Sequence, residues 1–370
     1  MKRGFLRGIL RAVFLLVGVT MQVGPAAAQD EPPFRIERIA EGVHAGLVNP
    51  FPPMYVFANA LIVVGDDGVL VVDTHASPSA TRAMIAHVRA LTNKPVKYLV
   101  NTHWHGDHVY GNATYREAFP SVQIVASVST AEDVRGAGAQ MLRDELAELP
   151  PSIAERDRWL ATGRGANGQE LSDADRARIA RSRRLRQGQV DELRSLELLP
   201  PEGLVEDSFT LRLGRREVRL YHVGPAHTRG DLIVWLPAER ILGVGDLLEE
   251  GVPYAGHGYP AGWARALERI EALDPAIIVP SHGAVQRDHA LLDAQRGLFR
   301  DIVSVTRTLH CAGNSGESTV EQAVATMMSK EPRPPVTPAA LEGFLRETVR
   351  RALDEAEAEG ERVCRTDDSG

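Results

Sequence analysis

The chain has 370 residues, of which 49 are acidic and 42 are lysine or arginine, so its formal net charge is −7 at pH 7. Its length suits one large domain or two of modest size. The acidic balance disfavours non-specific nucleic-acid binding, which depends on contacts of lysine and arginine with phosphates.

Residues 1–28 are predicted to be a secretory signal peptide. They contain four basic residues near the start, an apolar stretch over 12–23 and three alanines at 26–28. A retained membrane anchor is the alternative, but the apolar stretch is shorter than the roughly 20 residues that span a bilayer. We therefore expect cleavage after about Ala28 and a periplasmic or secreted protein that is not attached to the membrane. Cleavage lowers the net charge from −7 to −11, because it removes the four basic residues and no acidic one.

Residues 34–127 alternate between strand-like and helix-like patterns. Two runs rich in β-branched residues, 59–65 and 69–74, flank an Asp-Asp-Gly sequence and predict a hairpin. A helix is expected from Ser77-Pro78 up to an Asn-Lys-Pro break at 93–95. Further strands are expected at 96–100 and 122–127.

Residues 130–200 are dense in arginine, aspartate and glutamate and predict two or three solvent-exposed helices inserted into the fold. Acidic residues interrupt every basic run, so the segment offers no continuous basic face and a nucleic-acid-binding arm is disfavoured. The insertion is instead a candidate lid or a docking surface for a protein partner.

The second half of the chain returns to strand-like runs at 209–223, 231–236, 240–245 and 276–280, with a helix predicted over 261–273. From about residue 284 the chain is polar and is predicted to be helical, with a proline-rich break at 331–338 and an end at 365–370 that we expect to be disordered. Cys311 and Cys364 either form a disulfide or remain separate thiols, since an exported protein allows both.

Metal-competent side chains recur at or just after the ends of the apolar strands, at Asp73, His103, His227, Asp246 and His282. In an α/β sheet, the carboxyl ends of the strands form the edge at which ligand sites gather. We therefore expect these five side chains to converge.

The densest group lies in VNTHWHGDHVYGN, residues 100–112. In extended backbone His103 and His105 point the same way, which suits two imidazoles on one metal ion. Gly106 is expected to permit a sharp turn, after which Asp107 and His108 face a second metal ion. Histidine and carboxylate ligands without cysteine suit zinc, with iron and manganese as alternatives.

With these motifs the chain resembles the metallo-β-lactamase superfamily over roughly residues 34–290, apart from the insertion. THWHGDH (102–108) matches the H-x-H-x-D-H motif of the family, and GPAHT (224–228), GD (245–246) and SHG (281–283) match its other ligand motifs. The resemblance implies an α/β fold, a four-layered αβ/βα sandwich with the metal site along one edge. We assign it residues 29–290, with the helical insertion at 130–200 and a helical C-terminal extension at 291–370.

The resemblance also implies a ligand set for two zinc ions, position by position. Metal one would be bound by His103, His105 and His227. Metal two would be bound by Asp107, His108 and His282, with Asp246 bridging both ions. Asp73 matches an acidic residue that orients a ligand histidine.

Other candidates lie outside these motifs. His75 follows Asp73 by two residues and is a candidate for lining the site, although a packing role is the more ordinary one. The loop at 249–260 follows Asp246, and its Tyr254, His257 and Tyr259 are candidates for substrate contact.

The resemblance implies an exported binuclear zinc hydrolase of small molecules. A hydroxide that bridges the two metal ions, oriented by Asp107, would attack an ester, thioester, lactone or lactam-type bond. Dedicated β-lactamases have Cys or Ser where this chain has Asp246, which argues against a primary β-lactamase role. The sequence around the motifs is most similar to exported bacterial zinc hydrolases, some of which accompany quinoprotein oxidation or sulfur metabolism.

Two alternatives stay open. Persulfide dioxygenases share the scaffold and bind one iron through residues corresponding to His103, His227 and Asp246, but they are as a rule compact and intracellular. A non-catalytic periplasmic metal-binding or partner protein is the other alternative. The complete ligand set argues against it.

Overall fold

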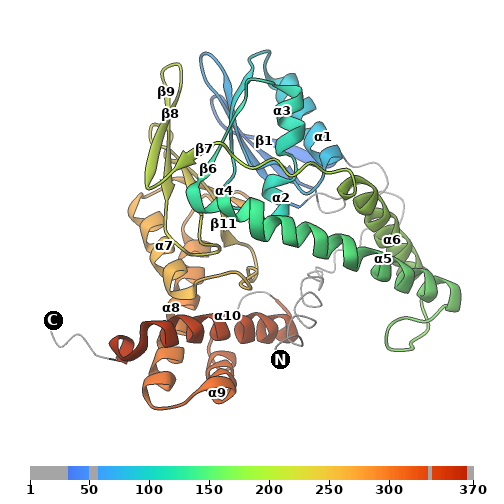
Figure 1. Cartoon of the computed structure of the whole chain (residues 1–370), viewed down its shortest axis with the longest axis vertical. Helices are drawn as coiled ribbons and strands as arrows, with labels where there is room; N and C mark the ends of the chain where they lie inside the picture. Colours follow the sequence, from blue (N-terminus) through green and yellow to red (C-terminus); the bar gives the residue numbers. More distant parts are fainter. Residues whose placement is uncertain (1–31, 50–56, 332–335, 365–370) are drawn as a thin grey trace. The chain divides into compact units, whose positions relative to one another are not determined.

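The computed structural model describes residues 32–49, 57–331 and 336–364 (Figure 1). The predicted signal peptide, the core of the proline-rich break and the predicted disordered end lie outside these residues. The chain divides into two compact units, one up to Leu220 and the other from Tyr221 onward. None of the helices in the described part of the chain combines the length and the apolar character that a membrane crossing requires.

The first unit is built on a mixed sheet of seven strands in the order β1 to β7. The strands are β1 (Phe34–Ala40), β2 (Val43–Val48), β3 (Ala60–Val64), β4 (Val69–Val72), β5 (Val96–Val100), β6 (Gln123–Ser127) and β7 (Gly203–Val205). Neighbours from β1 to β4 are antiparallel, and those from β4 to β7 are parallel. The carboxyl ends of β4, β5 and β6 therefore share one edge, which is where this unit places its metal-competent residues.

The local predictions for this unit are confirmed. β3 and β4 form the expected hairpin, with Val64 opposite Val69. Helix α1 (Pro78–Leu91) starts after Ser77, whose side chain caps the helix by accepting a hydrogen bond from the Ala80 amide. Its apolar face, including Met84, packs into a core with residues of β3 to β6. The short helices α2 (Gly106–Val109) and α3 (Asn112–Ala118) follow β5.

The 130–200 segment is helical, as predicted, with α4 (Val128–Asp133), α5 (Ala139–Thr162) and α6 (Asp173–Leu193). A π-helical turn, Val134–Gly138, joins α4 to α5. α5 and α6 lie side by side (Figure 1), and Arg183 of α6 forms an ion pair with Asp157 of α5 at 2.9 Å. The helices are not wholly solvent-exposed. Their buried residues Leu149, Ile153, Val190 and Leu193 form a core with Trp104, Val109 and Tyr110, so the insertion supports the segment that carries the histidine cluster.

Strands β8 (Ser208–Leu213) and β9 (Arg216–His222) lead into the second unit, and the boundary falls within β9. The second unit contains β10 (Leu232–Leu236), β11 (Ile241–Glu249) and β12 (Ile277–His282), and the helices α7 (Pro260–Ala272), α8 (Ala290–Cys311), α9 (Gly316–Met328) and α10 (Pro338–Glu359). β11 pairs antiparallel with β10 and parallel with β12, so this sheet is also mixed.

The C-terminal helices belong to the core of the second unit. Trp263 and Phe299 stack at a centroid distance of 4.4 Å, and the apolar residues of α8, α9 and α10 continue the same cluster. A disulfide joins Cys311, at the end of α8, to Cys364, at the end of a short 3-10 helix after α10. The structure thus favours pairing of the two cysteines, which the sequence left open.

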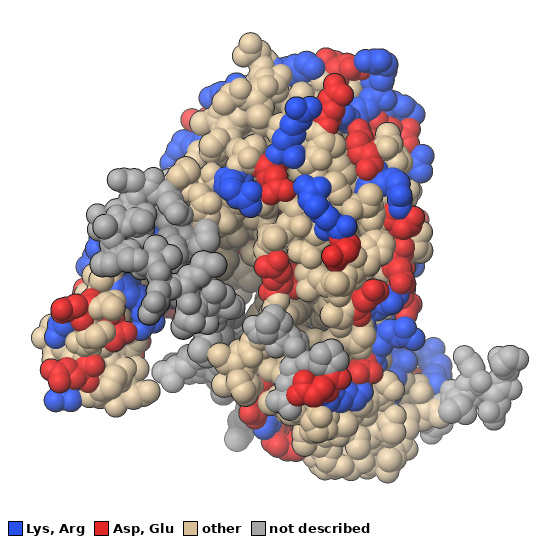
Figure 2. All heavy atoms as spheres, turned by 180° about the vertical axis from the view of Figure 1, so that it is seen from behind, with Lys and Arg blue, Asp and Glu red and all other residues tan. Residues whose placement is uncertain are grey.

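Charges on the surface are mixed. On the face shown in Figure 2, basic and acidic side chains are interspersed rather than gathered into patches of one sign. Ion pairs such as Arg346 with Glu321, at 2.8 Å, show the same interleaving in the described residues.

Candidate metal centre

Three imidazoles converge in the segment that follows β5, two in the loop and one on α2. His103, His105 and His108 are all buried. Nε2 of His103 lies 3.0 Å from Nδ1 of His105, and the rings of His103 and His108 are 4.0 Å apart between centroids. Buried imidazoles this close need a shared partner, because ring nitrogens cannot all donate to one another. This is the first of two histidine and carboxylate clusters.

Gly106 lies where the chain passes from the bend after β5 into α2. Its φ is not positive, so a left-handed conformation is not the reason for glycine at this position. Gly106 is the first residue of α2, and a Cβ atom there would overlap the ring of Tyr110. Glycine is required because of this close approach.

Asp73 follows β4 directly and lies against the histidine cluster. Its carboxylate accepts hydrogen bonds from the amide of Thr102 at 2.8 Å and the hydroxyl of Thr102 at 2.9 Å. Its Oδ2 also lies 2.9 Å from Nδ1 of His108, while Nε2 of His108 faces Asp107 at 3.3 Å. With Nδ1 of His108 beside Asp73, its Nε2 is directed toward Asp107. The orienting role of Asp73 stays a prediction.

His75 is buried and lies near His108 and Asp107. Its Nδ1 donates a hydrogen bond to the carbonyl of Ala58 at 2.7 Å, and its ring packs on Phe34 at 4.3 Å. Burial lowers the pKa of His75 to about 4, so the ring is neutral. These contacts correspond to the packing role.

Glu145 is a residue that sequence reasoning missed. It lies on α5, near Tyr110 and near enough to Asp107 for the negative charge of Asp107 to act on it. Burial, followed by the negative charge of Asp107, raises the pKa of Glu145 to about 8. Nothing in its sequence neighbourhood distinguishes Glu145 from the other acidic residues of the insertion, because only the packing of α5 brings it near Asp107.

The second cluster belongs to the other unit and starts in the loop after β9. His227 is buried in the segment GPAHT, where Gly224 adopts φ of 85°. The carboxylate of Asp231 accepts hydrogen bonds from the amide and the hydroxyl of Thr228, both at 2.8 Å. Burial raises the pKa of Asp231 to about 8. Asp231 therefore holds the loop that presents His227.

Asp246 contacts both other members of this cluster. Its Oδ2 lies 3.5 Å from Nε2 of His227, and its Oδ1 lies 3.4 Å from Nε2 of His282. The sequence predicted Asp246 and His282 at or just after the end of a strand. For Asp246 this is wrong, because the residue lies inside β11, which continues to Glu249. His282 is the last residue of β12, in agreement with the prediction.

Trp263 supports this second cluster and was not identified from the sequence. Its ring meets that of His227 edge-on at 5.1 Å, and its Nε1 donates to the carbonyl of Leu247 at 2.9 Å. α7 can approach the His227 loop because Gly262 faces the Pro225 carbonyl, where a Cβ atom would overlap. One helix therefore packs against both the loop of His227 and the strand of Asp246.

The candidates for substrate contact are partly buried. Tyr254 and His257 pack edge-on at 5.3 Å, and burial raises the pKa of Tyr254 to about 12. Arg351 of α10 lies over the ring of Tyr259 at 5.5 Å. The predicted 249–260 loop starts one residue later, because Glu249 belongs to β11.

The chemistry of both clusters suits a metal ion. Imidazoles and carboxylates are typical ligands of zinc, iron and manganese. Both cysteines are joined in the disulfide, so thiolate ligands are excluded. A neutral imidazole and an ionised carboxylate are the forms of these side chains that bind a metal ion.

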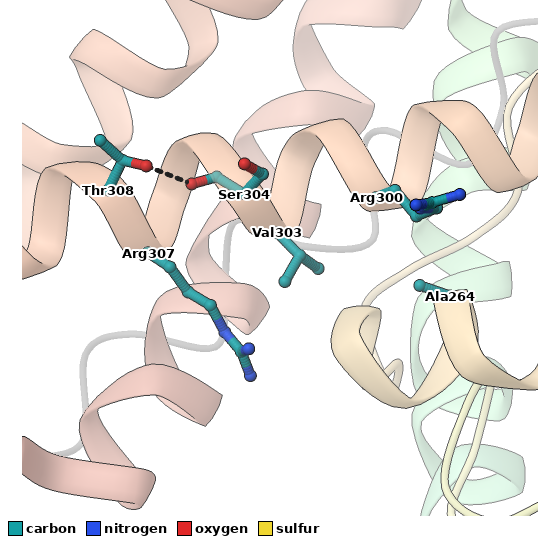
Figure 3. A pocket seen from close by; sticks show the side chains of 6 residues that line it. All are labelled: Ala264, Arg300, Val303, Ser304, Arg307 and Thr308. Carbon is teal, nitrogen blue, oxygen red and sulfur yellow. Dashed lines mark hydrogen bonds between the residues drawn. The ribbon is translucent and has the colours of Figure 1, made fainter. Parts of the chain in front are cut away.

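A surface pocket lies elsewhere in the second unit, along α8 (Figure 3). Its lining residues are Ala264, Arg300, Val303, Ser304, Arg307 and Thr308. Arg307 pairs with Glu359 at 3.0 Å, and Arg300 lies 3.9 Å from Glu268. None of the predicted site residues lines this pocket, so we do not place the reaction there.

The segment that contains these motifs also matches known proteins. Residues 55–282 match the model of the Metallo-beta-lactamase superfamily. The chain is 25% identical over 254 residues to a linear primary-alkylsulfatase of Pseudomonas sp. (strain ATCC 19151), an alignment that covers 66% of this chain and 44% of that protein. It is 28% identical over 100 residues to a metallo-beta-lactamase type 2 of Bacteroides fragilis, covering 25% of this chain and 40% of that protein. The chain thus matches less than half the length of both relatives.

A solved structure, a metallo-beta-lactamase from Pontibacter korlensis, superposes with a TM-score of 0.51 at 18% identity. The match covers 72% of this chain and 99% of that chain. At this identity the likeness concerns the fold alone. It confirms the predicted α/β sandwich with two mixed sheets, followed here by a helical C-terminal region.

Proposed function

Because the chain belongs to the Metallo-beta-lactamase superfamily of metal-dependent hydrolases, we propose that it is a binuclear zinc hydrolase of a small-molecule substrate. The observation that carries the proposal is the position of Asp246. Its two oxygens face different imidazoles, one on His227 and the other on His282. A carboxylate placed in this way is suited to bridge two cations.

The ligands in this proposal are those that the family resemblance assigns. Metal one is held by His103, His105 and His227, and metal two by Asp107, His108 and His282. Asp246 bridges both ions.

Two zinc ions, when bound, lower the pKa of a shared water molecule toward 7 and so supply a nucleophile at neutral pH. Asp107 would accept a hydrogen bond from that water molecule and orient it. Asp73 holds the ring of His108 with Nε2 toward Asp107 and so keeps His108 and Asp107 oriented toward one another. No serine or cysteine nucleophile is needed.

The bond that we propose to be cleaved is of the ester, thioester, lactone or lactam type. Asp246 stands where dedicated β-lactamases have Cys or Ser, which favours the first three. Sulfate-ester hydrolysis is a second candidate, since the similarity to an alkylsulfatase favours it.

We further propose that the protein is exported, on the strength of its basic, apolar and alanine-ended N-terminal pattern. The sequence around the motifs supports a place among exported bacterial zinc hydrolases, including those that accompany quinoprotein oxidation or sulfur metabolism.

The first test is the metal content of the purified protein, measured by elemental mass spectrometry. We expect about two zinc ions per chain. One iron per chain without zinc would contradict the proposal and favour a persulfide dioxygenase-like reaction. A protein that binds no metal would instead favour a non-catalytic role.

The second test is a substrate panel at equal concentrations: a carboxylic ester, a thioester, a lactone, a β-lactam and a primary alkyl sulfate. Asp107→Asn should abolish hydrolysis of whichever compound is cleaved, because the variant lacks the carboxylate that orients the water molecule. Retained activity in this variant would contradict the role given to Asp107.

A further inference from the structure

Glu249 is a metal-competent residue that the family motifs do not include. It lies on β11, three residues after Asp246, and it pairs with His282 in the parallel contact between β11 and β12. One ligand atom from each of Asp246, Glu249 and His282 lies within 4.8 Å of the other two. All three residues belong to the unit that begins at Tyr221.

An irregularity in β11 makes this convergence possible. Gly245 pairs with Pro280, and the next pair joins Glu249 to His282, so four steps along β11 correspond to two along β12. In a regular strand, side chains three positions apart point to opposite faces. Extra residues in one strand redirect its side chains. The irregular segment thereby brings the carboxylates of Asp246 and Glu249 to the same imidazole.

Buried hydrogen bonds hold this segment in place. Gln295 of α8 is only 4% exposed. Its Oε1 accepts a hydrogen bond from the amide of Glu249 at 3.2 Å, and its Nε2 donates to the carbonyl of Leu247 at 2.9 Å. Trp263 of α7 donates to the same carbonyl. Two helices therefore stabilise the backbone that places Glu249 beside His282.

The charges in this group also call for a cation. Two carboxylates that approach one another repel unless a proton or a metal ion offsets their charge. Here an imidazole nitrogen completes the set, and two carboxylates with one imidazole form a typical ligand set for a divalent ion.

We propose that Glu249 is a further ligand of metal two, next to His282 and the bridging Asp246. This inference rests on the proposed function, because it presumes that His282 and Asp246 bind metal. An added carboxylate strengthens binding of that ion and shifts its preference toward metals that favour oxygen ligands, such as manganese.

The test compares Glu249→Gln with the wild-type protein. The affinities of both zinc ions are measured by competition with a chromophoric chelator, and the unfolding midpoint is measured on metal-free protein. We expect one of the two zinc ions to bind at least about 10-fold less tightly, the other to be unchanged, and the metal-free midpoint to stay the same. Glu357→Gln removes the same charge from an exposed position on α10 and should leave both affinities unchanged.

If both zinc affinities of Glu249→Gln match those of the wild type, the inference is wrong. Should this variant fail to fold, Glu249→Asp is loaded with cobalt(II) and its visible absorption is compared with that of the wild type. A retracted carboxylate should change the absorptivity, and an identical spectrum would overturn the inference. Two zinc ions and hydrolysis in the wild type, with no effect of Glu249→Gln, would reject the role of Glu249 alone. A wild type without two metal ions would reject the proposed function itself.

Discussion

Oδ2 of Asp73 lies 2.9 Å from Nδ1 of His108, and both side chains are buried. Asp73 adopts φ of 63°, a left-handed conformation that is unfavourable for a residue with a Cβ atom. The bonds from Thr102 hold the carboxylate in this conformation. The strained backbone therefore directs the carboxylate at His108. Changing Asp73 is a direct way to test how His108 contributes to the metal centre.

Asp73→Asn should weaken zinc binding about 10- to 100-fold, because an amide holds the His108 ring less firmly than a carboxylate does. Competition with a chelator measures the change. Asp67→Asn, in the exposed hairpin turn where Asp67 pairs with Lys97, is the matched control and should bind zinc normally. Equal affinities for both variants would contradict the orienting role.

Gly106→Ala should destabilise the protein by about 1–3 kcal/mol, because the new methyl group would overlap the buried Tyr110 ring, which the surrounding core prevents from moving. Urea unfolding measures the loss. Gly188→Ala, on α6, places its methyl group in open space and should be neutral or stabilising by up to about 1 kcal/mol. If both variants behave alike, the close approach does not explain the glycine.

Trp263→Phe should lower the free energy of unfolding by about 1–2 kcal/mol, because it removes the donor to the Leu247 carbonyl from a fully buried position. Thermal unfolding followed by circular dichroism measures the effect. Trp159→Phe is the control, since this indole lies half-buried on α5 beside Arg156 and should cost less. A larger loss in the control would be inconsistent with the support that we assign to Trp263.

Glu145 should make the stability of the metal-free protein depend on pH. Its folded-state pKa of about 8 lies above the ordinary value of 4.5, so between these pH values the folded state binds more protons than the unfolded state. Stability therefore falls as the pH rises through this window. Glu145→Gln removes the effect, and the variant should exceed the wild type by about 1–2 kcal/mol at pH 8 but match it near pH 4.

Urea unfolding at pH 4, 6 and 8 checks this expectation. Glu148→Gln, exposed on the same helix, should follow the wild-type profile. A Glu145→Gln profile parallel to that of the wild type would show that the glutamate does not titrate in this range.

Replacing Cys311 and Cys364 by serine should destabilise the protein by about 4 kcal/mol, because the disulfide closes a loop between residues 53 positions apart and restricts the unfolded chain. Unfolding midpoints with and without reductant measure the effect. Reductant should lower the midpoint of the wild type and leave that of the double variant unchanged. A wild-type midpoint that is insensitive to reductant would indicate that the bond does not form.

The sequence by itself determined the local elements and the type of chemistry. The β-branched runs predicted β3 to β6, and Ser77-Pro78 predicted the start of α1, because strand periodicity and helix capping depend on neighbouring residues alone. The H-x-H-x-D-H motif indicated a metal site for the same reason, since its ligands lie within six residues.

Only the tertiary structure decided where the supporting side chains point. The left-handed backbone of Asp73 aims its carboxylate at His108, and the register shift in β11 turns Glu249 toward His282. Trp263 and Glu145 approach their clusters only because α7 and α5 pack there. Side-chain direction depends on backbone dihedral angles, strand register and contacts between distant segments, and no local sequence pattern specifies these.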